Sequence, residues 1–297
     1  MSGLPSTYLP AIPVWCAGCG HYAVLNALRV VVGALEIPSH EVMVLAGIGC
    51  SGSIQNYLGT YGYHALHGRV LPAATGVALS NPNLTVIAAG GDGDGYAIGG
   101  GHLLHAFRRN ASFAYILMNN ETYGLTKGQP SPGRLLAGGE PSLDGPLLGL
   151  SIAATTFVAR GYSGRFEQLL RLTRETLEHA RSGRGFAFLE VISPCVTYAD
   201  TYPQWEEVLH DVDADPGYDP GDRSAAFATA MRLASAGRLP TGVIYRAADA
   251  GRPARPAGPV PARAELASPG LRSRYEAVLD SYAVRVEPSA GPSKISA

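Results

Sequence analysis

The chain has 297 residues, a formal net charge of −1, and 46% hydrophobic against 16% charged residues. This composition predicts a globular protein with a sizeable core, built as one large or two ordinary domains. A near-neutral charge without a basic stretch gives no electrostatic basis for nucleic-acid binding. No apolar run approaches the roughly 20 residues of a membrane span, and the first twelve residues lack the features of a signal peptide. We therefore expect a cytoplasmic protein without a nucleic-acid or membrane partner.

Apolar runs alternate with helical patterns along the chain. Val24, Leu25 and Leu28 have helical spacing and predict a first helix over 21–31. Continuously hydrophobic runs, typical of a parallel sheet covered on both faces, predict strands over 41–46, 84–89, 114–118 and 186–192, with a shorter one over 156–159. Further helices are predicted over 96–109 and 166–180. This alternation predicts an open, mainly parallel α/β sheet with helices on both faces.

The character of the chain changes after about residue 202. An acidic, turn-rich stretch is followed by an alanine-rich helical pattern over 224–236, a segment rich in Pro, Gly and Arg over 251–261, and a tail over 288–297. We expect one α/β domain over 12–202 and a partly irregular C-terminal extension over 203–297, available for contact with a partner.

Two polar segments follow neighbouring predicted strands. Residues 91–95 read Gly-Asp-Gly-Asp-Gly, and Asn119-Asn120 end the next strand. Glycines at 91, 93 and 95 allow close approach of backbone N–H groups and positive φ, and a helix starting nearby favours an anion. Carboxylate and amide oxygens suit Mg²⁺ with a diphosphate. Two ordinary Gly/Asx turns are the alternative, but the combination favours a metal–diphosphate clamp at the carboxyl edge of the sheet.

Four cysteines are present, at positions 16, 19, 50 and 195. Cys16 and Cys19 form a C-x-x-C turn before a predicted helix, while Cys50 and Cys195 each follow a predicted strand. Without an export signal a disulfide framework is not expected, and four thiols make one complete metal or iron–sulfur site. A structural zinc, a redox dithiol at Cys16 and Cys19, or buried free thiols are alternatives, and the spacing alone does not separate zinc from iron.

The glycine-rich segment and its continuation resemble a known family. Residues 91–110 read GDGDGYAIGGGHLLHAFRRN, and residues 119–129 read NNETYGLTKGQ. Gly-Asp-Gly followed by Asn-Asn is the thiamine diphosphate motif, and the longer string is similar to the beta subunit of 2-oxoacid:ferredoxin oxidoreductases, over roughly residues 12–202. The resemblance implies Mg²⁺ bound by Asp92, the Asn120 side chain and the Thr122 carbonyl. It further implies a cofactor site that includes Ile48, Gly49, Cys50, Ser51, His67, Gly93, Asp94, Gly124 and Leu125.

The same resemblance gives the cysteines a role. The strings WCAGCG at 15–20, GIGC at 47–50 and PCVTY at 194–198 match the three places where the family holds one [4Fe-4S] cluster. Ala17 stands where proline is frequent, which should change the stiffness of the turn but not the ligands. Because Cys50 also belongs to the segment that contacts the cofactor, the resemblance implies a cluster beside the thiamine diphosphate, where it can accept electrons.

Two further polar residues stand near the predicted site. Lys127 lies in a glycine-flanked loop, and we expect it to act as a catalytic residue that contacts a substrate carboxylate or CoA; most lysines, however, are simply exposed. His64 is expected to be an ordinary solvated histidine.

The chain also lacks a part that its chemistry needs. The resemblance assigns the glutamate that activates the cofactor to a separate pyrimidine-binding domain, and no second α/β unit is evident. We expect an alpha (or fused gamma-alpha) subunit to complete the site, and the complex to convert a 2-oxoacid, of pyruvate or 2-oxoglutarate type, with CoA and oxidised ferredoxin into acyl-CoA, CO2 and reduced ferredoxin. The alternatives are a subunit of a non-oxidative thiamine diphosphate decarboxylase and a zinc-stabilised non-catalytic subunit.

Overall fold

The computed structural model describes residues 11–135 and 142–248, together with the single positions 270, 273, 276 and 280. Residues 1–256 form one compact unit and residues 257–297 another, and the large sheet with its covering helices belongs to the first. The segment predicted over 251–261 and the tail over 288–297 lie outside the described residues.

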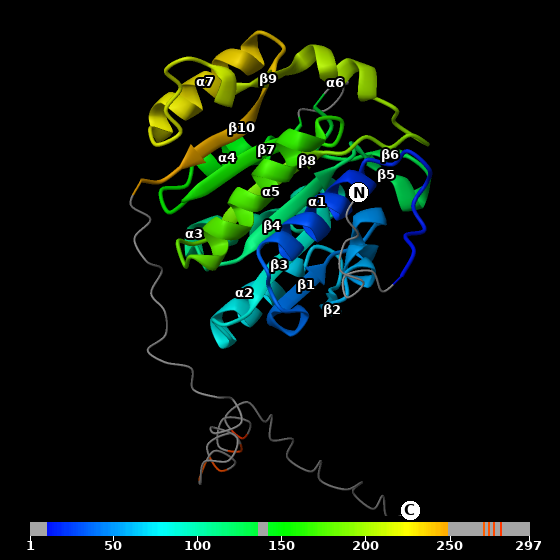
Figure 1. The fold of residues 1–297 in the computed structure, drawn as a ribbon, viewed down its shortest axis with the longest axis vertical. Coiled ribbons are helices and arrows are strands. Elements are labelled where there is room, and N and C mark those ends of the chain that lie inside the picture. Colours follow the sequence, from blue (N-terminus) through cyan, green and yellow to red (C-terminus); the bar gives the residue numbers. More distant parts are fainter. Residues whose placement is uncertain are drawn as a thin grey trace, which may run out of the picture. The chain divides into compact units, whose positions relative to one another are not determined.

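One large sheet organises the described part of this unit (Figure 1). Its eight strands run in the order β2-β1-β3-β4-β8-β7-β10-β9. Every neighbouring pair is parallel except β7 with β10. The strands are β1 (Val42–Ala46), β2 (Tyr61–His64), β3 (Thr85–Gly91), β4 (Ala114–Asn119), β7 (Phe157–Tyr162), β8 (Ala187–Ile192), β9 (Leu209–Asp211) and β10 (Leu239–Arg246). The open, mainly parallel sheet predicted from the continuous apolar runs is confirmed; β5 (Thr122–Tyr123) and β6 (Gln129–Pro130) form a separate small pair.

Helices cover both faces of the sheet, as predicted. They are α1 (His21–Ala34), α2 (Val70–Ser80), α3 (Gly100–Arg109), α4 (Gly145–Leu150), α5 (Phe166–Arg181), α6 (Tyr202–Val208) and α7 (Arg223–Ser235). Short 3₁₀ turns are η2 (Ser39–Glu41), η3 (Cys50–Tyr57), η5 (Gly124–Thr126) and η6 (Val212–Ala214), and η4 (Gly93–Ile98) is a π-helix. In the described part of the chain no helix has both the length and the apolar character needed to cross a bilayer.

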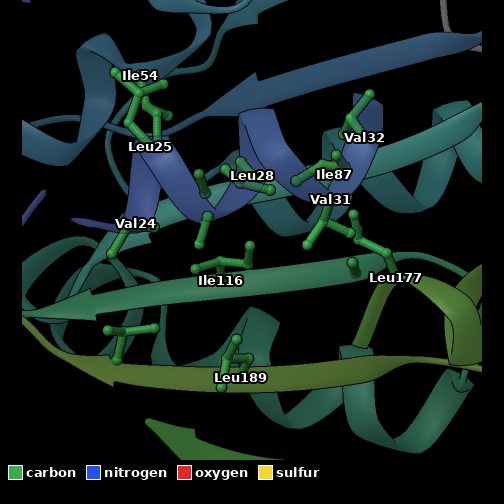
Figure 2. Packing of buried hydrophobic residues seen from close by; sticks show 14 of the residues in the cluster. Val24, Leu25, Leu28, Val31, Val32, Ile54, Ile87, Ile116, Leu177 and Leu189 are labelled. Atoms are coloured by element: carbon green, nitrogen blue, oxygen red, sulfur yellow. The ribbon is translucent and has the colours of Figure 1, made fainter. Parts of the chain in front are cut away.

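Alternating strand side chains build two apolar layers. On one face Ile116 and Leu189 belong to the same apolar cluster as Val24, Leu28 and Val31 of α1 (Figure 2). On the other face the alternate residues of the same strands pack against α2, α3 and α4. Both layers are buried, which explains why most positions of the central strands are apolar on both faces. Arg160 on β7 and Glu190 on β8 are exceptions, and they pair with each other.

The helix predicted over 96–109 begins differently in the structure. The π-helix η4 follows β3 directly, and α3 starts only at Gly100. None of the glycines at 91, 93 and 95 has a positive φ, so the left-handed conformation that glycine allows is not used there. Glycine is needed there for space: a Cβ atom at Gly93 would collide with the ring of Tyr123, and one at Gly95 with the hydroxyl of Tyr115.

The C-terminal region contributes to the same sheet. β10 pairs with β7 in antiparallel fashion, and β9 pairs with β10. The helix predicted over 224–236 is confirmed as α7, whose N-cap Asp222 accepts a hydrogen bond from the Ala225 N–H at 3.0 Å. Strands from both sides of residue 202 therefore share one sheet, and the domain boundary expected there is not a break in it.

His179, on α5, makes the stability of the fold depend on pH. Its Nε2 lies 3.1 Å from the Thr156 hydroxyl, and burial, together with Arg184 and Arg246, lowers its pKa to about 3. A histidine in the unfolded chain titrates near pH 6.5, so between these values the unfolded state binds more protons and the fold loses stability as the pH falls. In His179→Gln the free energy of unfolding should fall less steeply with decreasing pH than in wild type, by up to about 1.4 kcal/mol per pH unit. Urea unfolding of both chains at several pH values between 7 and 5 measures this pH dependence. An equal dependence of the free energy of unfolding on pH in both chains would contradict the role given to His179.

Candidate functional site

Four strand ends bring the predicted site residues together. β1, β3, β4 and β8 are parallel neighbours, so their carboxyl ends lie along one edge of the sheet. The segments that leave this edge are 47–50, 92–95, 120–122 and 193–195. The convergence predicted for Cys50, the glycine-rich segment and the Asn pair is therefore confirmed.

A cavity of about 160 Å³ opens at this edge. All cofactor-site residues expected from the sequence line it, as do the three expected Mg²⁺ ligands: Ile48, Gly49, Cys50, Ser51, His67, Asp92, Gly93, Asp94, Asn120, Thr122, Gly124 and Leu125. His21, Gly91, Tyr123 and Thr126 also line it. Lys127 does not: it is exposed, follows η5 with φ +74° and lies one residue beyond the lining residue Thr126.

Asp92 is a buried carboxylate at the floor of the cavity. It is 1% exposed, and burial raises its pKa to about 7, although a hydrogen bond from the Ser131 hydroxyl partly offsets this. Asn120 lies beside it, and its Oδ1 accepts a bond from the Thr122 N–H at 3.3 Å while keeping a second lone pair. A divalent cation would relieve the desolvated charge, and the oxygen donors present are those that Mg²⁺ prefers. The residues therefore fit the metal.

Asp94 plays a different part from its neighbour. Its Oδ1 accepts hydrogen bonds from the N–H groups of Ile48 at 2.9 Å and Gly68 at 2.8 Å. The same oxygen lies 2.9 Å from Nδ1 of His67. A carboxylate partner fixes the proton on Nδ1 and leaves Nε2 free to face a ligand. Asp94 lines the cavity, but its carboxylate joins three segments and orients His67.

The three cysteine segments are held against one another. The Gly20 N–H donates to the Pro194 carbonyl at 3.3 Å, and the indole N–H of Trp15 donates to the Cys50 carbonyl at 2.7 Å. Ser193 joins this assembly to the metal loop, because its N–H donates to the Asn119 carbonyl at 2.7 Å. The loops that carry the four thiols thus meet at the cavity edge.

The thiols themselves influence one another. Burial raises the pKa of the Cys19 thiol to about 11, the backbone N–H of His21 acts in the opposite direction, and Cys195, Cys50 and Cys16 raise it further. All four are free thiols. Among the described residues no three Cys, His, Asp or Glu side chains lie close enough to hold a single metal ion. A Cβ atom at Gly124 would lie 3.2 Å from Sγ of Cys50, so this thiol abuts the loop that lines the cofactor cavity.

His21 is a site residue that the sequence did not reveal. It begins α1 directly after the C-x-x-C turn, lines the cavity and is 1% exposed. Its Nδ1 lies 2.7 Å from the Ser193 hydroxyl, and burial lowers its pKa to about 4, so the imidazole is neutral near pH 7. Ser131 was missed in the same way. Only its position after the Asn120 loop hints at the contact with Asp92, which is made across two loops.

Comparison with known proteins agrees with this geometry. Residues 40–191 match the thiamine pyrophosphate enzyme C-terminal TPP binding domain, and residues 195–252 match the C-terminal region of the pyruvate ferredoxin oxidoreductase beta subunit. Fold and site thus define a thiamine diphosphate-binding domain.

Similar proteins identify the family within this class. The chain is 40% identical to 2-oxoacid:ferredoxin oxidoreductase 2, subunit beta, of Aeropyrum pernix over 78% of this chain and 79% of that one. It is 40% identical to the 2-oxoglutarate oxidoreductase subunit KorB of Mycobacterium tuberculosis over 63% and 51%. The solved 2-oxoglutarate:ferredoxin oxidoreductase of Magnetococcus marinus, with 2-oxoglutarate, coenzyme A and succinyl-CoA bound, superposes with a TM-score of 0.75 at 30% identity, covering 97% of this chain and 94% of that one. The chain belongs to the family of 2-oxoacid:ferredoxin oxidoreductase beta subunits, and it is a component of a multi-subunit enzyme.

Proposed function

We propose that this chain holds thiamine diphosphate through Mg²⁺, carries one [4Fe-4S] cluster, and acts with an alpha (or fused gamma-alpha) subunit. The complex converts a 2-oxoacid of 2-oxoglutarate or pyruvate type and CoA into acyl-CoA and CO2 and passes the electrons to ferredoxin. The observation that carries this proposal is that Asp92, Asn120, Thr122 and Cys50 line one cavity.

The proposed metal ligands are the Asp92 carboxylate, the Asn120 amide oxygen and the Thr122 carbonyl. Gly93, Gly124 and His67 line the same cavity and would hold the diphosphate, with Nε2 of His67 available to it because Nδ1 is bonded to Asp94. Thiamine diphosphate held there would supply the nucleophile for the 2-oxo carbon and an electron sink for decarboxylation. The protein's part is to neutralise the diphosphate and fix its position.

The proposed cluster ligands are Cys16, Cys19, Cys50 and Cys195. Support comes from the mutual effect of the four thiols on the pKa of Cys19 and from the hydrogen bonds that join their three loops. Cys50 belongs to both sites, which makes the cluster a neighbour of the cofactor and a ready electron acceptor. Zinc held by the same thiols is the alternative, and iron analysis separates the two.

The partner is inferred from what the cavity lacks. It is smaller than the roughly 300–1,000 Å³ of complete ligand pockets, and among its lining residues none is a glutamate. We assign residues 12–202 to the cofactor and the cluster, and residues 203–297 to an extension that contacts the partner. The substrate class follows the names of the relatives and the ligands of the solved structure.

The test is co-purification of this chain with its partner without oxygen, followed by reduction of ferredoxin or a viologen dye over a panel of 2-oxoacids. We expect CoA-dependent reduction with 2-oxoglutarate or pyruvate. Decarboxylation without dye reduction would point to a non-oxidative decarboxylase. Zinc in place of iron, with no bound thiamine diphosphate, would point to a non-catalytic subunit.

Lys127 is the proposed contact for a substrate carboxylate or CoA. Because its side chain is exposed and does not line the cavity, Lys127→Ala should leave the folded chain and its cofactor content intact. We expect the KM for the 2-oxoacid or for CoA to rise by about tenfold, the value of one charge-assisted hydrogen bond. Steady-state kinetics of the complex measures this, with Lys127→Arg as the variant that keeps the charge. An unchanged KM for both substrates would remove Lys127 from the site.

A further inference from the structure

A buried charged network lies beside the cavity without lining it. Arg160 on β7 and Glu190 on β8 face each other across the two strands, and Nε of Arg160 lies 2.7 Å from Oε2 of Glu190. Both residues are fully buried. Asp144, the N-cap of α4, lies 2.9 Å from Nη2 of the same arginine. Burial lowers the pKa of Arg160, but the two carboxylates outweigh it and hold the pKa above its usual value, so the guanidinium remains charged and fixed.

The second oxygen of Glu190 connects this network to the strand that ends at the metal loop. Oε1 accepts hydrogen bonds from the Tyr96 hydroxyl at 2.7 Å and from Nδ2 of Asn119 at 3.0 Å. An amide has donors on one side and an acceptor on the other. Glu190 therefore determines which way the Asn119 amide points.

In this orientation, the Asn119 side chain forms hydrogen bonds with two segments next to the proposed metal site. Its Oδ1 accepts from the N–H of Glu121 at 3.1 Å, in the turn between Asn120 and Thr122. Its Nδ2 also donates to the Gly133 carbonyl at 2.9 Å. Gly133 lies directly against Asp92, because a Cβ atom there would be 2.6 Å from Cβ of Asp92. The fully buried Asn119 amide thus fixes the turn that carries the proposed ligands Asn120 and Thr122. It also fixes the segment that packs against the third proposed ligand, Asp92.

We propose that Glu190, held in place by Arg160, is a positioning residue for the Mg²⁺–thiamine diphosphate site and acts through Asn119. The inference rests on the proposed function, because it concerns the same metal ligands. Glu190 and Arg160 contact neither the cavity nor its contents. Their effect is to hold the oxygens of Asp92, Asn120 and Thr122 in one arrangement before the cofactor arrives.

Glu190→Gln tests the proposal with almost no change in volume. A glutamine at this position must direct its NH2 group either at Arg160 or at the side of Tyr96 and Asn119. The Arg160 guanidinium and Nδ2 of Asn119 can only donate, so at least one of these two hydrogen bonds is lost. In the full-length complex, stripped of cofactor, we expect Mg²⁺–thiamine diphosphate to bind about 10- to 100-fold more weakly. Titration calorimetry measures this independently of activity.

Thr156→Val is the matched control. Thr156 belongs to another buried hydrogen-bond network, with Asn110 and His179, at the start of β7 and away from the cavity. Its loss should lower thermal stability and leave cofactor affinity unchanged. A parallel fall in affinity in both variants would show that Glu190 acts only through general stability.

A double variant separates folding from positioning. Buried ion pairs can be replaced by apolar residues of similar size without loss of stability, so Arg160→Met with Glu190→Leu should fold even if Glu190→Gln does not. It still removes the Glu190 acceptor and leaves Nδ2 of Asn119 only the Gly133 carbonyl, and we expect the same weakened binding. A folded double variant that binds as wild type does would overturn the inference. If wild type itself fails to bind, the proposed function is wrong and not the positioning role.

Discussion

Replacing Asp92 with alanine should abolish cofactor retention and activity. Asp92 is the one carboxylate proposed to bind Mg²⁺, and Oδ1 of Asp94, the other carboxylate residue that lines the cavity, is bonded to His67 and two N–H groups. The loss should exceed the roughly 100-fold typical of residues that only support metal ligands. Thiamine diphosphate content after anaerobic purification and the ferredoxin-reduction rate measure it, with exposed Glu207→Ala as the control. Normal retention would remove Asp92 from the metal site.

The same substitution should stabilise the cofactor-free chain. Burial raises the pKa of Asp92 from 3.8 to about 7, so between these values the folded state binds more protons than the unfolded state. The contribution of this carboxyl to stability therefore falls as the pH rises towards 7 and stays low above it. At pH 8 Asp92→Ala removes this cost, of up to about 4 kcal/mol, and should raise the melting temperature of the apo-chain. At pH 4 the melting temperatures of wild type and Asp92→Ala should be closer together. Addition of Mg²⁺ and thiamine diphosphate should raise the melting temperature of wild type and so offset the difference from Asp92→Ala.

Replacing Cys50 with alanine should have the second large effect. The chain then keeps only three of its four thiols, and an open ligand position leaves the proposed cluster prone to loss. We expect most of the iron and the broad visible absorption to disappear and dye reduction to stop. Iron analysis and an absorption spectrum before and after dithionite measure the loss.

Trp15→Phe provides the comparison for Cys50→Ala. It removes the hydrogen bond from the indole to the Cys50 carbonyl but keeps all four thiols. Iron content should therefore stay near the wild-type value, while the cluster becomes easier to lose in air. Full iron content in Cys50→Ala would show that this thiol is not a ligand.

Local patterns were sufficient to predict the central strands of the sheet and their mainly parallel arrangement. Strands β1, β3, β4 and β8 are buried on both faces and are therefore largely apolar, which marks them in the sequence; Glu190 on β8 is a buried exception that pairs with Arg160. Parallel pairing then forces the segments after them to one edge, so that Cys50, Asp92 and Asn120 could be placed together from the sequence.

Contacts between distant segments could not be predicted in this way. Asp94 is bonded to His67, 27 positions away, and Asn119 to Glu190, 71 positions away. Nothing in the local sequence indicates these pairs, so the sequence places Asp94 at the cofactor and Asn119 beside the metal ligand Asn120 without identifying the distant partner of either. The antiparallel strand β10 was missed for a related reason, because only its pairing with β7 makes it part of the sheet.

Ser193 couples the proposed metal site to the proposed cluster site. Its N–H holds the Asn119 carbonyl, its hydroxyl holds His21, and it lies two positions before Cys195. Damage by oxygen at the proposed cluster would release this segment and loosen the turn that carries Asn120. An enzyme inactivated in air would then fail to recover when thiamine diphosphate is added alone, and repair would have to begin with iron and sulfide.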